Sequence, residues 1–392
     1  MPENIKDSGD ADEWLKTELE KFCLNYSDIK CIDAVTVRNT RFRFPEANQA
    51  APSFCTQHSR NGKYEQPYCD SVEITQKLRR RGVEMSDEEY AVASLGKIGY
   101  YRLKGYGLSL RVEGEDRFLT ENYRAGTQFE DLIELYEFDR QLRIRILDAI
   151  ERIEVAFRAR LNDTMASRHG SHWFMQETLF SDKRNKKSGK LVFDHQVFIE
   201  KAYGEARRNK ESLPIRHYYQ KYGDPILPPC WMLSEVLSMG TWSKAYGMLA
   251  NRADQKAVAD HFCTSPPELA SWIHALTNLR NTCAHHNRLW DRRFVTCPSK
   301  KKNLRGIVDK NDRLFAQIAA LLYCLLTVDP ESKWLLRLNE LIAQSPHVEL
   351  SKMGFPDDWL VRLGGVSDLI RRGERNGCSE ELQGMDSDSQ VS

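Results

Sequence analysis

Apolar residues recur at helical spacing through most of the chain, from about residue 70 to about residue 360. The longest regular stretch runs from about Phe129 to Arg168, and Gly170 is expected to end it. Its stripe advances by threes and fours with one doubled step, through Leu135, Leu142, Ile146, Ile150, Ile153, Phe157 and Leu161. This period is typical of a long helix that buries one face. The opposite face is predicted to carry Arg140, Arg143, Glu151, Arg152 and Arg158.

A helix start is marked shortly after residue 85. Ser86 and Glu89 have the spacing of a capping box, in which each side chain satisfies a free amide of the first turn. The pattern predicts a helix that runs towards Leu103 and is broken by Gly105 and Gly107.

More helices are expected further along the chain. Residues 265–268 (SPPE) combine an N-cap, first-turn prolines and an acid, and they predict a helix through Cys283. Other predicted helices cover residues 193–208, 214–222 and 312–327, with a restart near Trp231 after the prolines at 225, 228 and 229. No strands alternate with these helices, so the predicted fold class is all-α.

The longest apolar run, from Ile318 to Val328, has 11 residues. A helix needs about 20 to cross a bilayer, so this run predicts a buried core helix and no membrane partner. The first residues lack the apolar stretch of a secretion signal, and the ten cysteines form no CxxC pair. These features predict a cytoplasmic protein with reduced thiols.

The sequence pattern divides the chain into three predicted parts. Residues 1–67 are an extension of unknown role, in which Asp12 to Tyr26 has the stripe of an amphipathic helix and Cys31 to Phe44 is β-branched. Residues 68–367 form the helical domain. Residues 368–392 are rich in Ser, Asp and Gly and are expected to be a disordered tail.

The charge balance excludes one class of protein. Lysine and arginine total 57 against 56 acids, a net charge of +1, which argues against a protein coated in positive charge for nucleic acid but leaves room for a local basic site. Cys55, His58 and Cys69 are zinc-ligand types, but their spacing matches no standard zinc knuckle. We therefore expect no metal and no cofactor.

The residues that carry the most chemistry lie between 278 and 290 (NLRNTCAHHNRLW), where Arg280 and Asn281 precede His285. An arginine followed by a histidine at this spacing is weak evidence by itself. With about 3.6 residues per turn, Asn281 and His285 share a helix face while Arg280 lies about 140° away from His285. The three could converge if the helix loosens, if the arginine swings, or if two chains pair.

Several separated blocks strengthen the interpretation. They are residues 78–82 (LRRRG), 98–106 (IGYYRLKGY), 135–140 (LYEFDR), 150–154 (IERIE), 217–219 (HYY), 227–232 (LPPCWM), 289–290 (LW) and 353–356 (MGFP). In this order they resemble the Abi-like family of bacterial abortive-infection proteins, which belongs to the HEPN superfamily. The resemblance covers about residues 70 to 360 and implies a HEPN-like helical bundle with additional helices.

The resemblance also implies a function, a metal-independent endoribonuclease toxin that acts in phage defence and leaves 2′,3′-cyclic phosphate and 5′-hydroxyl ends. Arg280 would stabilise the phosphate, because a guanidinium stays charged and offers a planar fork to oxygens. His285 would transfer protons, and Asn281 would orient it. The family pairs two motifs across a two-fold axis, which predicts a homodimer, and an RNA or protein antitoxin is a further expected partner.

Residues outside the motif are candidates for RNA contact, namely Tyr101, Arg102, Lys104, Arg158, His286 and Arg288. Each has a structural alternative: packing of a helix end for Tyr101 and its neighbours, capping for His286, and an ordinary ion pair with Glu154 for Arg158. Glu154 and Arg158 could also support the motif helix. The alternative function is a non-catalytic RNA-binding or scaffold protein on the same fold, and a third is a zinc-dependent hydrolase using the N-terminal Cys and His residues.

Overall fold

The structure is a computed structural model, and it describes residues 67–114, 119–181, 183–184, 191–300, 304–345 and 348–371. The chain divides into a unit of residues 1–70 with 221–226 and a unit of residues 71–220 with 227–392. The second unit carries the architecture below. The predicted helix from Asp12 to Tyr26, the β-branched segment from Cys31 to Phe44 and the tail beyond residue 371 lie outside the described residues.

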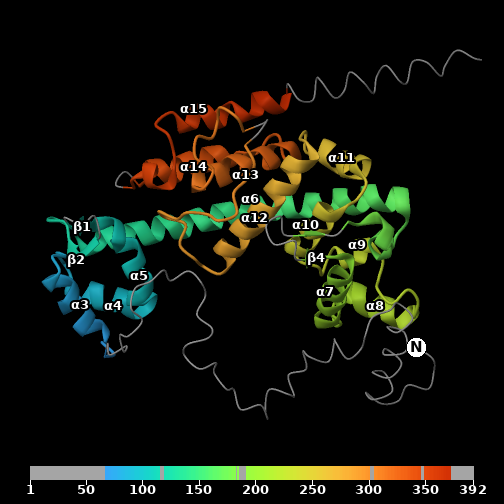
Figure 1. Cartoon of the computed structure of the whole chain (residues 1–392). Helices are drawn as coiled ribbons and strands as arrows, with labels where there is room; N and C mark the ends of the chain where they lie inside the picture. Colours follow the sequence, from blue (N-terminus) through green and yellow to red (C-terminus); the bar gives the residue numbers. More distant parts are fainter. Residues whose placement is uncertain are drawn as a thin grey trace, which may run out of the picture. The chain divides into compact units, whose positions relative to one another are not determined.

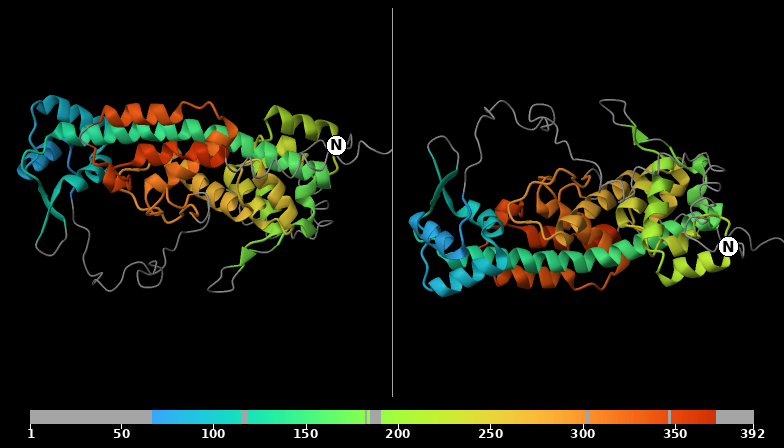
Figure 2. Two further views of the ribbon diagram at one scale, coloured as in Figure 1. Left: turned by 90° about the horizontal axis from the view of Figure 1, so that it is seen from above. Right: turned by 90° about the horizontal axis from the view of Figure 1, so that it is seen from below.

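One long helix, α6 (Phe129–His169), is the axis on which the second unit is built (Figures 1 and 2). Helices α5, α9, α10, α11, α12, α13 and α14 all contact it. The predicted apolar stripe from Leu135 to Leu161 is buried, and Gly170 ends the helix as expected. The prediction for Arg143 is wrong, because this side chain is buried rather than on the charged outer face. It lies one turn after Asp139, which it neutralises.

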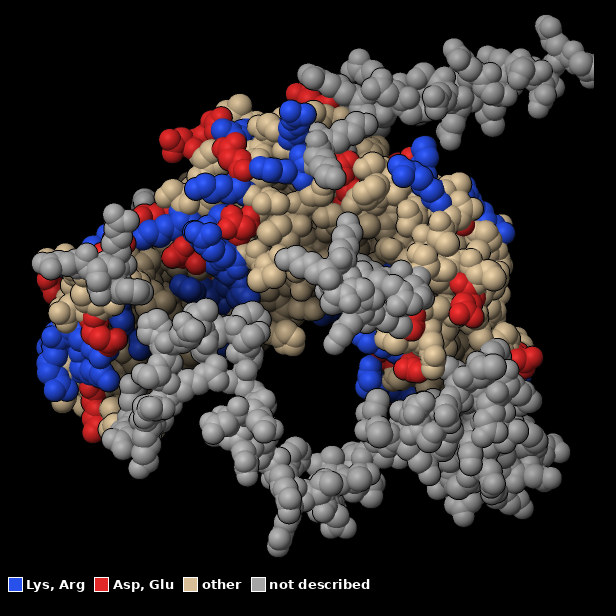
Figure 3. All heavy atoms as spheres, in the orientation of Figure 1, with Lys and Arg blue, Asp and Glu red and all other residues tan. Residues whose placement is uncertain are grey.

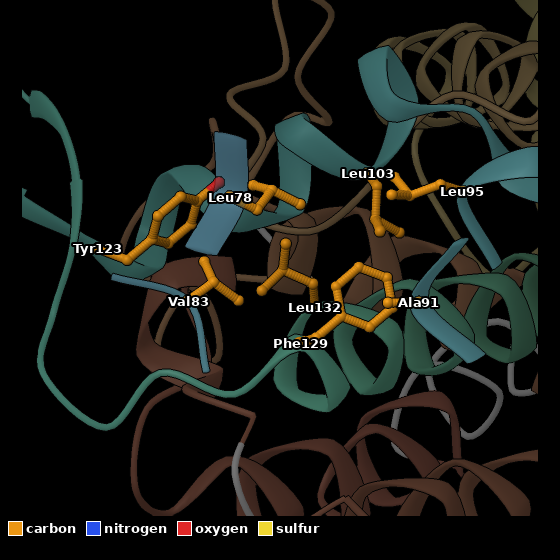
Figure 4. Packing of buried hydrophobic residues seen from close by; sticks show 8 residues of the cluster. All are labelled: Leu78, Val83, Ala91, Leu95, Leu103, Tyr123, Phe129 and Leu132. Atoms are coloured by element: carbon orange, nitrogen blue, oxygen red, sulfur yellow. The ribbon is translucent and has the colours of Figure 1, made fainter. Parts of the chain in front are cut away.

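The chain before α6 forms a small helical lobe. Its elements are α3 (Ser71–Arg80), α4 (Glu88–Ile98), α5 (Tyr100–Gly107), the 3-10 turn η3 (Leu108–Leu110), β1 (Arg111–Glu113) and β2 (Leu119–Tyr123). The two strands pair antiparallel. Their core is a cluster of eight buried residues from these elements and the start of α6, labelled in Figure 4: Leu78, Val83, Ala91, Leu95, Leu103, Tyr123, Phe129 and Leu132.

The structure corrects two predictions about this lobe. The N-cap of α4 is Asp87, which accepts from the amide of Tyr90 at 2.9 Å, while Ser86 donates to Glu130 of α6. The predicted single helix to Leu103 is two helices, because Gly99 adopts a φ of 86°, a conformation that favours glycine. Gly105 lies inside α5, whereas Gly107 is its last residue, so the predicted break falls at the second glycine.

The segment after α6 packs aromatic side chains together. Its elements are η4 (Trp173–Met175), η5 (Glu177–Leu179), β3 (Lys183–Arg184), β4 (Leu191–Phe193), α7 (His195–Arg208), α8 (Leu213–Lys221), α9 (Cys230–Leu233), α10 (Met239–Met248) and α11 (Arg252–Asp260). Trp173 and Trp242 have ring centroids 6.1 Å apart, and Phe198 lies 6.2 Å from Trp242. This cluster packs η4 and α7 against α10.

The remaining helices are α12 (Pro266–Ala284), α13 (Leu314–Val328), α14 (Trp334–Ala343) and α15 (Trp359–Gly364), with the turn η6 (Leu350–Met353) before α15. Ser265 is the N-cap of α12 as predicted, although its hydroxyl bonds to the Glu268 carboxylate rather than to a backbone amide. Helix α13 is buried from Leu314 to Leu325. Among the described helices, none combines the length and apolar character that a membrane span requires.

The all-α prediction is confirmed, with two short antiparallel hairpins as the described sheet structure. The order of the elements puts α5, α6 and α12 in mutual reach, since α6 contacts both of the others. These three elements position the candidate site.

Substitutions at two glycines test the packing, because one position is crowded and the other is open. An added Cβ at Gly107 would lie 2.8 Å from the Tyr123 hydroxyl and 2.9 Å from its ring, whereas one at Gly247 in α10 meets nothing within 4 Å. We expect Gly107→Ala to lower the free energy of unfolding by about 1–3 kcal/mol. Gly247→Ala should leave it unchanged or raise it by up to about 1 kcal/mol. Urea denaturation measures both, and an equal loss in the two variants would contradict the packing.

Candidate active site

The site begins where α12 ends. The helix stops at Ala284, and His286 adopts a φ of 57°. The amide of His286 donates to the Cys283 carbonyl and that of Asn287 to the Thr282 carbonyl, both at 2.9 Å. This is the Schellman pattern, with a histidine at the position that glycine usually fills. The turn ends the helix with His285 at its C-cap.

The motif residues face solvent while the helix is anchored behind them. Leu276, Leu279 and Cys283 are buried, whereas Arg280, Asn281 and His285 are exposed. The Arg280 side chain is 45% exposed. Its Nη1 lies 3.5 Å from the Asn281 side-chain oxygen. The three groups are therefore accessible to a ligand at the end of α12.

A carboxylate on α6 lies beneath the motif arginine. Glu154 is buried and forms an ion pair with Arg158 one turn later. Its second oxygen lies 3.8 Å from Nε of Arg280. Glu154 therefore forms the expected ion pair with Arg158 and also contacts the motif helix through Arg280, so the two roles considered for this pair are both present. An ion pair with a half-exposed arginine adds little stability, so the contact between Glu154 and Arg280 is not a main support of the fold.

Helix α5 is fastened to the segment after α12 by two arginines. Arg102 donates to the carbonyl of His286 at 2.6 Å, and Arg288 donates to the carbonyl of Gly105. Each of these candidate RNA-binding residues therefore has a structural contact. Tyr101 is 92% exposed, and Lys104 is half-buried on the same helix. The structure thus brings Arg102, Arg288 and the backbone of His286 together beside the motif, while Tyr101 and Lys104 share helix α5 with Arg102.

One buried carboxylate fixes this arrangement from inside. Asp139 of α6 accepts from the amide of Trp290 at 2.8 Å, from the amide of Leu289 at 3.1 Å, and from the Tyr106 hydroxyl at 2.7 Å. Arg143 completes the group with an ion pair. Burial raises the pKa of Asp139, while these four donors oppose the shift. Asp139 therefore ties α5 and the residues directly after the motif to α6.

Sequence reasoning missed Asp139, although a signal was present. The apolar stripe of α6 takes a doubled step between Leu135 and Leu142, and Asp139 lies in that gap, on the buried side. A charged residue inside a core stripe is rarely buried unless it is paired. The doubled step could have identified a buried polar site.

A family comparison covers this whole arrangement. A model of a family described as Abi-like protein matches residues 93–291, which span α5, α6, α12 and the motif. The chain belongs to the Abi-like family. This family is part of the HEPN superfamily, and its name associates the protein with abortive infection, a defence against phages. No curated protein and no solved structure matches the chain.

The motif helix of this Abi-like protein also contains a cysteine. Burial raises the pKa of the Cys283 thiol in the motif helix to about 12, which leaves it a poor nucleophile at neutral pH. In the described ranges, no three His, Cys, Asp or Glu side chains lie together as metal ligands would. Cys55 and His58, the N-terminal zinc candidates, lie outside those ranges.

The role of Asp139 can be measured against an exposed aspartate of the same helix. Asp139→Ala leaves a buried guanidinium and two amides without their acceptor, so we expect a loss of about 3–5 kcal/mol in the free energy of unfolding. Asp148→Ala removes exposed pairs with Arg152 and Arg337, and we expect a loss below about 1 kcal/mol. Denaturant unfolding compares them, and similar losses would argue against the buried network.

Proposed function

We propose that this Abi-like protein is a metal-independent endoribonuclease that cuts RNA during abortive infection. The observation that carries the proposal is the exposure of Arg280, Asn281 and His285 together at the end of a helix that buries its apolar face. The matched family supports a role in phage defence and is consistent with a nuclease. RNA is the substrate class that this set of side chains suits, because it supplies its own nucleophile.

The proposed reaction needs no metal. The 2′-oxygen attacks the adjacent phosphorus as its proton moves to a base, and the bond from phosphorus to the 5′-oxygen breaks as that oxygen takes a proton. Histidine suits both transfers because its ordinary pKa of about 6.5 lies near cellular pH. A guanidinium suits the extra negative charge on the phosphate. His285 therefore has the proton-transfer role and Arg280 the phosphate role, with Asn281 beside it.

The environment of Arg280 supports this assignment. Glu154 contacts Nε of Arg280 at 3.8 Å, Nη1 lies 3.5 Å from the Asn281 side-chain oxygen, and the side chain is 45% exposed, so the guanidinium is accessible to a phosphate. One chain offers His285 as one proton-transfer group, whereas the reaction has two proton transfers. We therefore propose that two chains pair about a two-fold axis with their motifs facing each other, so that each supplies a histidine.

The first test is RNA cleavage in EDTA. We expect wild-type protein to cut a labelled RNA under these conditions, and Arg280→Ala and His285→Ala each to lower the rate at least about a hundredfold, because each removes a charge or a proton-transfer group from the transition state. Gel analysis of the labelled RNA measures the rates.

Two variants serve as matched controls for the cleavage test. His274→Ala changes an exposed histidine of the same helix, and Arg252→Ala changes an exposed arginine of α11. Both should retain wild-type rates. If wild-type protein binds the RNA but does not cut it, the nuclease assignment is wrong and the protein is a non-catalytic RNA-binding protein. Activity lost in EDTA and restored by zinc would point to a metal-dependent hydrolase.

Mixing wild-type and variant chains tests whether two chains share one active site. Wild-type and His285→Ala chains are combined in equal amounts and allowed to exchange partners at constant total concentration. If each site needs a histidine from both chains, about one quarter of the wild-type activity remains, because only that fraction of dimers has two intact chains. Chains that act alone would retain about one half. Mixing with His274→Ala should cause no loss.

A further inference from the structure

A second charged cluster lies in the lobe before α6, on residues that the proposed reaction does not use. Arg81, from the loop after α3, and Arg111, from β1, both pair with the carboxylate of Glu121 on β2. The distance from Nη1 of Arg111 to Oε1 of Glu121 is 3.3 Å. The Glu121 side chain is 56% exposed, whereas those of Arg81 and Arg111 are 18% and 4% exposed. The buried guanidinium of Arg111 and the partly buried one of Arg81 thus share one carboxylate that is open to solvent.

Arg111 has donors that this carboxylate does not satisfy. In the part of the chain that the structure describes, its Nε and Nη2 have no hydrogen-bond partner although both are buried. Among the same described residues, the neighbouring Tyr123 hydroxyl is also buried without a hydrogen-bond partner. The Tyr123 ring lies 5.4 Å from the guanidinium carbon, a cation–π contact that offsets part of the deficit. Buried N–H groups without an acceptor are unfavourable, so the cluster would gain from an acceptor with more oxygens.

Positive charge exceeds negative charge around Glu121. Arg81 also donates to the Tyr100 hydroxyl at 3.2 Å, and Lys104 lies one turn after Tyr100 on α5. Burial of Glu121 would raise its pKa, but the charges of Arg81, Arg111 and Lys104 outweigh it and hold the pKa below the usual range. Figure 3 shows several Lys and Arg side chains gathered at α3. The cluster is therefore a local basic site in a nearly neutral protein.

We propose that Arg81 and Arg111 form a binding site for a phosphate group, and that Glu121 occupies this site until a phosphate displaces it. A phosphate has more oxygens than a carboxylate and can accept from two guanidinium forks at once. Glu121, half-exposed on its strand, can turn to solvent, where ionised groups are well hydrated. The Tyr100 and Tyr123 hydroxyls can donate to the same phosphate.

Helix α5 links this phosphate site to the motif. Tyr100 and Lys104 lie on the side near Arg81 and Glu121, whereas Arg102 and Gly105 bond to the residues after α12. A phosphate of an RNA strand and the terminal phosphate of a nucleotide are the two sources that share this chemistry. The inference concerns binding and stands whether or not the motif cuts RNA.

Glu121→Gln gives the sharpest test, because a phosphate site and a purely structural ion cluster predict opposite results. Binding of inorganic phosphate to the full chain is measured by calorimetry at fixed ionic strength. We expect Glu121→Gln to tighten binding severalfold, since it removes the competing charge. Arg81→Gln should weaken it about tenfold, since it removes charge-assisted hydrogen bonds.

The exposed pair of Arg79 and Glu88, 2.9 Å apart, provides matched controls. Arg79→Gln and Glu88→Gln should leave phosphate binding unchanged. The proposal is overturned if inorganic phosphate does not bind wild-type protein, if Glu121→Gln weakens binding, or if Arg79→Gln matches Arg81→Gln. Should Arg81→Gln fail to fold, the sign of the Glu121→Gln effect still decides.

A competition binding experiment distinguishes the two candidate sources of the phosphate group. A nucleoside 5′-monophosphate and a 5′-hydroxyl oligoribonucleotide are each added against inorganic phosphate, using His285→Ala protein so that no RNA is cut. Displacement by the nucleotide alone assigns the site to a terminal phosphate, and displacement by the oligonucleotide assigns it to the RNA backbone. Failure of both to compete would overturn the proposal, and neither result depends on cleavage.

Discussion

The buried carboxylate of Asp139 is the constraint on which the rest of the site depends. An ionised carboxylate cannot remain in a protein interior unless donors surround it. Here the donors come from different parts of the chain: Tyr106 on α5, Arg143 one turn away on α6, and the amides of Leu289 and Trp290. Satisfying one group therefore brings three segments, far apart in sequence, into a fixed relation.

The exposed chemistry of the motif follows from this buried contact. Because Leu289 and Trp290 are held at α6, the chain must leave α12 by a tight turn, and His286 adopts the left-handed conformation that this turn requires. Arg102 and Arg288 fasten the same turn to α5 from outside. A rigid backbone on both sides of His285 leaves its side chain, with that of Arg280, at the surface. Preorganisation of this kind suits a site that acts on a charged substrate.

The elements that depend on local pattern were predictable. The long helix α6, its end at Gly170, the N-cap of α12 at Ser265 and the burial of α13 all follow from periodicity and capping chemistry. The details that failed depend on tertiary contacts. Ser86 lost the capping role because Glu130, 44 residues later, accepts its hydroxyl. Arg143 is buried because Asp139 and Tyr106 need its charge and its donors.

The same distinction applies to the site. Arg280, Asn281 and His285 could be selected from the sequence, because the motif and the surrounding blocks are local. The contact of Arg280 with Glu154 on α6 and the sharing of Glu121 by Arg81 and Arg111 join residues distant in sequence. No periodicity predicts such pairs. Residues 1–67 include Cys55 and His58, and they lie almost wholly outside the described structure.

The central claim is that RNA is cut by its own 2′-oxygen at the end of α12. The most direct measurement uses an RNA whose cleavage position is mapped, prepared again with a single 2′-deoxy nucleotide on the 5′ side of that bond. The account predicts that the deoxy linkage stays intact while other cut positions remain sensitive, and that products carry 2′,3′-cyclic phosphate and 5′-hydroxyl ends. Cleavage of the deoxy linkage, or 5′-phosphate ends, would contradict it, because water would then be the nucleophile.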